Sequence, residues 1–283
     1  MLLLGYAVLR KKPFFENRLM STSIAIPISA DLVDHNRLLK YTVCLHLVKK
    51  VLDKELATSL SPYLFHTIGS VACFIDKQLD SLNIDQQKQL VENFDALFYD
   101  LWQSKYLSDF SQTIIQYNRK HNLKCSCTLE SITSLFTFIN YCKERELKEE
   151  LRFFGKEIIQ INIQKQNCTS TAAIVKTLQT EGKAVVNLLE NLLVRDLDAY
   201  SKFHQTISYL AYLEHILNLG DDTLDAHRDA KKGILNSALS KLHPIKMAGY
   251  LAAHICKTFI LHPIKTSYYA PTLTLYYLRN SKK

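Results

Sequence analysis

The stretch from Leu64 to Asp80 reads Leu-Phe-His-Thr-Ile-Gly-Ser-Val-Ala-Cys-Phe-Ile-Asp-Lys-Gln-Leu-Asp. Apolar residues recur in it every three or four positions, which places them on one side of an α-helix. They are Leu64, Ile68, Val71, Ala72, Ile75 and Leu79. Ser61 and Pro62 come just before, and Ser as N-cap with Pro in the first turn is a typical helix start. The sequence therefore predicts a helix over about 62–82.

The same spacing continues along most of the chain, and residues that interrupt helices are scarce. Only 7 Gly and 6 Pro occur in 283 residues, while 47% of the residues are hydrophobic. A helix should start near 29–31, and further helices are predicted over about 85–107, 109–121, 129–141, 143–163, 171–193, 197–230, 234–242 and 245–261. We expect an all-α protein, a single bundle of about nine or ten helices.

No linker rich in Gly, Ser or Pro divides the chain. We expect one helical domain over 21–283 with a basic, aromatic C-terminal tail, preceded by an extension over 1–20 that need not be ordered. The apolar run at 2–9 is too short to span a bilayer, and no later run reaches the necessary length. Seven irregularly spaced cysteines favour reduced thiols. A cytoplasmic location follows, with association at a membrane surface left open.

The net charge of +8 suits several kinds of partner. Nucleic acid, anionic lipid and a phosphorylated substrate would all be attracted, and a solvated surface rich in lysine would give the same charge without any partner. No zinc-finger or RNP pattern occurs, so nucleic acid is not expected. His66, His204 and His215 are scattered in helical runs and are interpreted as core or surface residues.

The chain has two groups of aspartates, and within each group the residues are four positions, about one helical turn, apart. The first is Asp76 and Asp80, and the second is Asp221, Asp225 and Asp229. Aspartates four residues apart lie on one helix face and repel each other, and Asp is a poor helix former. A bound divalent cation is one physical reason for such a pattern, because Mg²⁺ prefers one or two carboxylates together with phosphate oxygens.

Helical phasing relates the two groups. At about 100° per residue, Asp76 and Asp80 lie just off one edge of their apolar stripe, and Asp221 and Asp225 lie off the same edge of theirs, whereas Asp222 points away. A cavity inside a bundle could reach both groups. The alternative is an ordinary exposed helix face, with the acids paired to basic neighbours. Those neighbours are Lys77, Arg228, Lys231 and Lys232.

At these residues the chain resembles the class I isoprenoid synthases. The two D-x-x-x-D motifs, 145 residues apart from Asp76 to Asp221, are similar to those of the squalene/phytoene synthase branch. The pattern D-x-x-x-D-x-x-x-D-x-x-x-G from Asp221 to Gly233 is also similar to the bacterial tetraprenyl-β-curcumene synthase group of large terpene cyclases. Lys77 stands where phytoene synthases commonly have a second Asp, and this difference argues against head-to-head coupling more than against binding of metal and diphosphate.

The resemblance implies a helical bundle that encloses an apolar cavity. Asp76 and Asp80 would hold Mg²⁺ on one wall, and Asp221, Asp225 and Asp229 on the other. Arg228 and Lys232 would bind the diphosphate of an allylic prenyl substrate of farnesyl length or longer, and diphosphate would be released by cyclisation or by coupling. Two alternatives stay open: a non-catalytic helical scaffold or partner subunit, and a peripheral lipid-binding protein that uses the tail from Lys246 to Lys283.

Overall fold

A computed structural model of the chain describes residues 45, 48–54, 61–123, 128–193, 205–213, 215–216, 219–220 and 244–269. Within these residues every regular element is an α-helix, which confirms the predicted all-α class. The long helices are α4 (Pro62–Ser81), α5 (Ile84–Gln103), α6 (Leu107–Lys120), α7 (Leu129–Glu144), α8 (Lys148–Asn167), α9 (Thr171–Leu193) and α11 (Pro244–Leu261). Shorter helical segments cover 48–54, 205–213 and 263–269.

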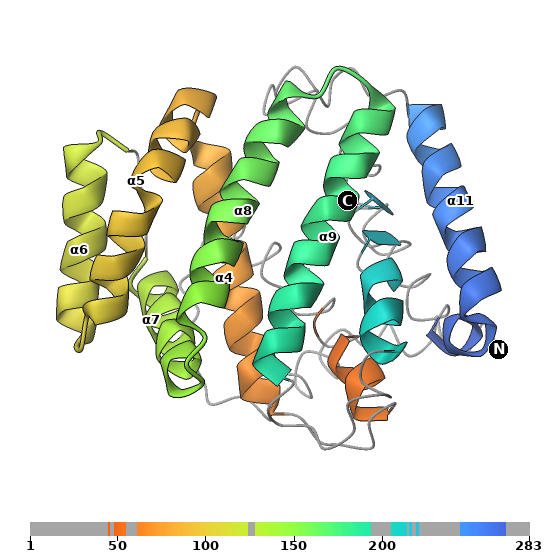
Figure 1. Cartoon of the computed structure of the whole chain (residues 1–283), viewed down its shortest axis with the longest axis horizontal. Helices are drawn as coiled ribbons and strands as arrows, with labels where there is room; N and C mark the ends of the chain where they lie inside the picture. Colours follow the sequence, from red (N-terminus) through yellow and green to blue (C-terminus); the bar gives the residue numbers. More distant parts are fainter. Residues whose placement is uncertain are drawn as a thin grey trace, which may run out of the picture.

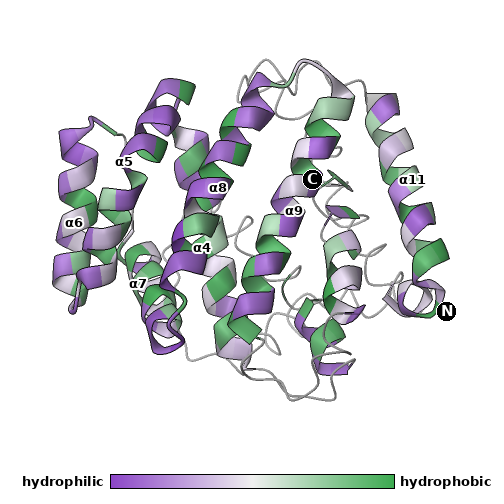
Figure 2. Cartoon of the chain, viewed as in Figure 1, coloured by the Kyte–Doolittle hydropathy of each residue, from purple (hydrophilic) through white to green (hydrophobic). Residues whose placement is uncertain are grey.

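The helices form a bundle with α8 and α9 side by side at its middle (Figure 1). In this view α5, α6 and α7 lie on one side of that pair, α4 passes behind it, and α11 forms the opposite edge. Figure 2 shows apolar and polar stripes along α8 and α9, as expected of helices with one face in the core.

The starts of α5 and α4 carry local sequence signals, a capping box at α5 and a first-turn proline at α4. Asn83 accepts a hydrogen bond from the backbone N–H of Gln86 at 2.9 Å, and the Gln86 side chain accepts one from the N–H of Asn83 at 3.0 Å. This reciprocal capping box starts α5. At α4 the proline lies in the first turn as predicted, but the Ser61 side chain makes no capping hydrogen bond.

Two breaks between helices lie a few residues away from the predicted positions. The helix expected over 85–107 ends at Gln103, because the backbone of Ser104 is no longer helical. The Ser104 carbonyl accepts a hydrogen bond from Lys143 Nζ at 2.9 Å. The helix expected to start at 143 begins instead at Lys148, since Glu146 adopts a left-handed conformation with φ of 55°. Neither break contains Gly or Pro, so the sequence does not mark its position sharply.

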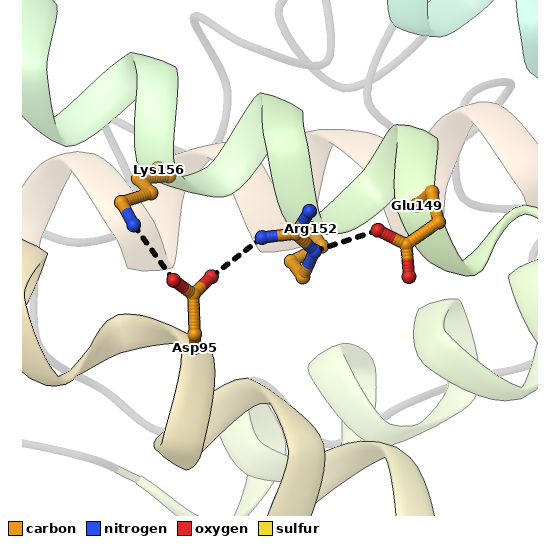
Figure 3. Close-up of polar contacts among 4 residues, drawn as sticks. All are labelled: Asp95, Glu149, Arg152 and Lys156. Atoms are coloured by element: carbon orange, nitrogen blue, oxygen red, sulfur yellow. Dashed lines mark hydrogen bonds and ion pairs between the residues drawn. The ribbon is translucent and has the colours of Figure 1, made fainter.

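The contact between α5 and α8 combines close backbone packing with exposed ion pairs. Asp95 of α5 accepts hydrogen bonds from Arg152 and Lys156 of α8, both at 2.7 Å, and Arg152 also donates to Glu149 at 2.8 Å (Figure 3). These bonds hold the pKa of the Asp95 carboxyl below its ordinary value. Exposed ion pairs of this kind contribute little to stability.

One large apolar core joins most of the helices. Its fully buried members include Leu52, Phe110, Cys142, Leu193 and Tyr209, from segments far apart in the sequence. A smaller core lies between α9, Leu219 and Met247 of α11. None of the described helices is both long and apolar enough to cross a membrane. The single domain over 21–283 stays a prediction, and the extension over 1–20 lies outside the described residues.

Candidate functional site

Asp76 and Asp80 lie one turn apart near the C-terminal end of α4. Asp76 is partly buried and Asp80 is exposed, and Leu79 between them is buried. The two carboxylates therefore run from the margin of the core outward to solvent. Phasing along the predicted stripe places both just off one of its edges, but Gly69 and Cys73 on that same side of α4 are buried as well.

The helix that carries them is buried over a wider arc than predicted. Leu64, Val71 and Leu79 of the predicted stripe are buried, whereas Ile68, Ala72 and Ile75 are only partly so. Several further α4 residues are buried, namely Phe65, Thr67, Gly69, Cys73 and Phe74. α4 packs mainly on α7, and its buried side chains reach into the large core on more than one side.

The second aspartate group lies beyond the described residues. Asp221, Asp225 and Asp229, with Arg228 and Lys232, all fall in 221–243. The segment that leads to them is described in part, and it is deeply buried: Tyr209, Leu210, Leu213 and Leu219 are 0% exposed. Tyr209, Leu210 and Leu213 belong to the same core cluster as Leu64, Phe65 and Val71 of α4.

The described part of the chain does not assemble a metal site by itself. Among these residues no group of three or more His, Cys, Asp or Glu side chains is placed to hold an ion. The sequence interpretation requires carboxylates from both aspartate groups, and only Asp76 and Asp80 are among the described ones.

Two surface hollows lined by described residues lie away from the aspartates. One, of about 450 Å³, is lined by the helical segment 48–54 through Lys49, Lys50, Asp53 and Lys54. The other, of about 540 Å³, lies between α6 and α7. Asp76 and Asp80 line neither of them, so the enclosed apolar cavity expected from the resemblance stays a prediction.

A pair of histidines forms a polar cluster that sequence reasoning did not single out as a pair. His215, 4% exposed, packs against His254 of α11 with ring centroids 4.1 Å apart and ring planes at 78°. Nε2 of His254 lies 2.9 Å from the side-chain nitrogen of Gln179 on α9. An amide nitrogen can only donate, so Nε2 of His254 is the acceptor.

The remaining nitrogens of this pair are buried without hydrogen bonds. They are Nδ1 and Nε2 of His215 and Nδ1 of His254. Burial, with a smaller contribution from His254, lowers the pKa of His215 to about 4, although the backbone of Leu178 nearby acts in the opposite direction. Burial also lowers the pKa of His254, helped by Lys257. Both rings are therefore neutral near pH 7, which suits core residues. No sequence signal joins two histidines that lie on separate helices.

Comparison of the chain with protein-family models, with curated proteins and with solved structures found no match in any of the three. A functional assignment therefore rests on the chain's own residues.

Proposed function

We propose that this chain is a Mg²⁺-dependent enzyme of the class I isoprenoid-synthase type, acting on an allylic prenyl diphosphate of farnesyl length or longer and releasing diphosphate. The placement of Asp76 and Asp80 carries the proposal. They stand one turn apart, at the margin of the core, on a well-buried helix of an all-α bundle. The same core holds the segment that leads to Asp221, which supports a site shared by the two aspartate groups.

The residues present on α4 suit Mg²⁺. This ion takes oxygen ligands, usually one or two carboxylates together with phosphate oxygens and water, and keeps part of its hydration shell. A partly buried Asp76 beside an exposed Asp80 supplies two such ligands without closing the site to water or substrate.

Each residue of the proposed site has a distinct role. Asp76 and Asp80 would hold the ion from one side, and Asp221, Asp225 and Asp229 would hold it from the other. Arg228 and Lys232 neutralise and orient the diphosphate. Bound Mg²⁺ would stabilise the negative charge that develops on diphosphate as the allylic C–O bond breaks.

Incubation of the purified full chain with geranyl, farnesyl and geranylgeranyl diphosphates tests the proposal. Mass spectrometry of the products and a diphosphate assay should both report turnover that requires Mg²⁺ and stops with a chelator. Asp76→Asn keeps the side-chain shape and removes the charge, and we expect it to lower kcat/KM by about a hundredfold or more, in line with the loss of a key electrostatic group. Glu92→Gln, at an exposed position of α5, is the matched control and should keep full activity.

Two outcomes would contradict the proposal. If no prenyl diphosphate gave Mg²⁺-dependent release of diphosphate, the enzymatic proposal would be wrong and a non-catalytic helical protein would remain. If Glu92→Gln lost as much activity as Asp76→Asn, the effect would not belong to the α4 aspartates.

A further inference from the structure

Helix α11 has apolar side chains on its outer face as well as on the face that packs inward. The inner face meets the small core through Met247 and Leu251, and His254 on the same side contacts Gln179 of α9. The opposite face is exposed and has no charged side chain along its centre: Gly249, Ala252, Ala253, Cys256, Phe259 and Ile260. The outer face of a surface helix is normally polar. This helix, at the edge of the molecule in Figures 1 and 2, departs from that rule.

The exposed apolar surface continues past the end of α11. Seven of the thirteen large hydrophobic residues that are exposed in the described part of the chain fall within 250–268. They are Tyr250, Ile255, Phe259, Ile260, Leu261, Ile264 and Tyr268, with Ile260 76% and Ile264 84% exposed. We call the outer side of α11, formed by Gly249, Ala252, Ala253, Cys256, Phe259 and Ile260, together with Ile264 just beyond it, the outer apolar face. Such a concentration on one short segment marks an interaction surface rather than scattered surface residues.

The net positive charge of the protein lies at the same end of the chain. Residues 230–283 contain nine Lys and Arg and no Asp or Glu, whereas residues 1–229 contain 26 basic and 27 acidic residues. The net charge of +8 therefore belongs entirely to the C-terminal 54 residues. On α11 the exposed Lys246 and Lys257 lie eleven residues apart, so they share one flank of the outer apolar face.

We propose that the outer apolar face docks on an anionic membrane surface. Phe259, Ile260 and Ile264 enter the boundary between headgroups and acyl chains, while Lys246 and Lys257 meet acidic headgroups beside them. An apolar face flanked by lysines is the pattern of helices that lie in the membrane interface, and their binding combines apolar burial with attraction to anionic lipid.

The charge of the C-terminal segment favours an anionic membrane over a second copy of the chain or a nucleic acid as the partner of this face. A second copy of the chain would bring two acid-free, positive segments together, and like charges facing each other disfavour that contact. A nucleic acid would use the lysines but would leave the apolar side chains in water. An anionic membrane satisfies both features of the face. The inference does not depend on the proposed catalytic function.

Flotation of the full chain with lipid vesicles tests the proposal. We expect binding to vesicles that contain phosphatidylserine, weak or no binding to phosphatidylcholine alone, and release as salt is raised. Ile260→Glu combined with Ile264→Glu should lower the apparent affinity at least tenfold, and Lys257→Glu should lower it on the order of tenfold. All the substituted side chains are exposed or on the outer face, and circular dichroism should show an unchanged helix content.

Matched controls lie elsewhere on the surface. Phe153→Glu on α8, where the side chain is 66% exposed, and Lys105→Glu between α5 and α6 should bind vesicles like the wild type. A fluorophore on the exposed Cys256 should shift to the blue on binding, and the shift should be absent from Cys256→Ser. Equal binding to both lipid compositions, or equal loss in the control variants, would overturn the proposal. So would a dimer in solution that Ile260→Glu dissociates, because the face would then join two copies.

Discussion

At the scale of single residues, the buried His215 makes stability depend on pH. Its pKa in the folded protein is about 4, against an ordinary value near 6.5 in the unfolded chain. Above about pH 6.5 the ring is neutral in both states and contributes no dependence. Between pH 6.5 and 4 the unfolded chain binds the proton first, so acidification favours unfolding.

We expect the free energy of unfolding to fall in that window by up to about 1.4 kcal/mol per pH unit from this residue. His215→Leu removes the titrating ring and should flatten the curve between pH 6.5 and 4, while His254 still contributes. Chemical denaturation at a series of pH values provides the measurement. Parallel curves for the wild type and the variant would show that His215 is not the group responsible.

Also at this scale, the α4 aspartates show what a residue pattern can predict. Helical spacing places them just off one edge of the predicted apolar stripe, and in the structure Asp76 is partly buried and Asp80 is exposed. The wider burial of α4 was also signalled, since Phe65, Cys73 and Phe74 are apolar residues outside the predicted stripe. The contact between His215 and His254 could not be foreseen, because it depends on how two separate helices pack.

At the scale of elements, two helical glycines offer opposite tests of packing. A Cβ atom on Gly155 of α8 would lie 2.5 Å from Cζ of Phe94 on α5, so the two helices approach closely there. A Cβ on Gly249 of α11 would meet no described atom within 4 Å. Gly155→Ala forces Phe94 to move, and Phe94 is stacked on Phe98 with ring centroids 5.9 Å apart.

Gly249→Ala should therefore stabilise the protein by about 0.5–1 kcal/mol, since only the entropy of the unfolded chain changes. Gly155→Ala should destabilise the protein by about 1–3 kcal/mol through overpacking. The entropic gain expected for Gly249→Ala also applies here and offsets part of that loss. Urea denaturation measures both. Gly155→Ala in a Phe94→Leu background should cost less than in the wild type, because the side chain that it meets is shorter. Equal effects at the two glycines would show that α5 and α8 do not meet as described.

The helix boundaries show where element prediction from sequence stops. The starts of α4, α5 and α7 lie close to the predicted residues, because proline or a capping side chain marks each of them. The breaks at Ser104 and Glu146 depend on tertiary contacts, such as that from Lys143 to the Ser104 carbonyl, and on a left-handed residue that is not glycine. Local pattern contains neither kind of information.

At the scale of the whole molecule, the all-α bundle follows from scarce helix breakers and sustained periodicity. The candidate site does not follow in the same way, because it requires segments 145 residues apart to meet. Phasing indicates which side of each helix faces the core, but it cannot determine which helices become neighbours. The shared core of α4 and the segment 205–213 supplies part of that information.

A site shared by both aspartate groups makes a prediction that is independent of turnover. Mg²⁺ together with inorganic diphosphate should raise the melting temperature of the wild type, because a ligand that binds only the folded state stabilises that state. At a hundredfold excess over Kd the gain in free energy of unfolding is about 2.7 kcal/mol. Asp76→Asn and Asp221→Asn should each abolish most of this rise. The double variant should behave no worse than either single one, since groups that hold the same ligand are not additive.

Asp222→Asn is the internal control for that experiment, because helical phasing turns its side chain away from the shared site. It should keep the full rise in melting temperature. If Asp76→Asn and Asp221→Asn each removed part of the rise and their effects added, the two groups would bind separate ions. If Asp222→Asn lost as much as Asp221→Asn, the phasing of the second helix would be wrong. Thermal stabilisation therefore distinguishes one composite site from two unrelated acidic patches without a turnover assay.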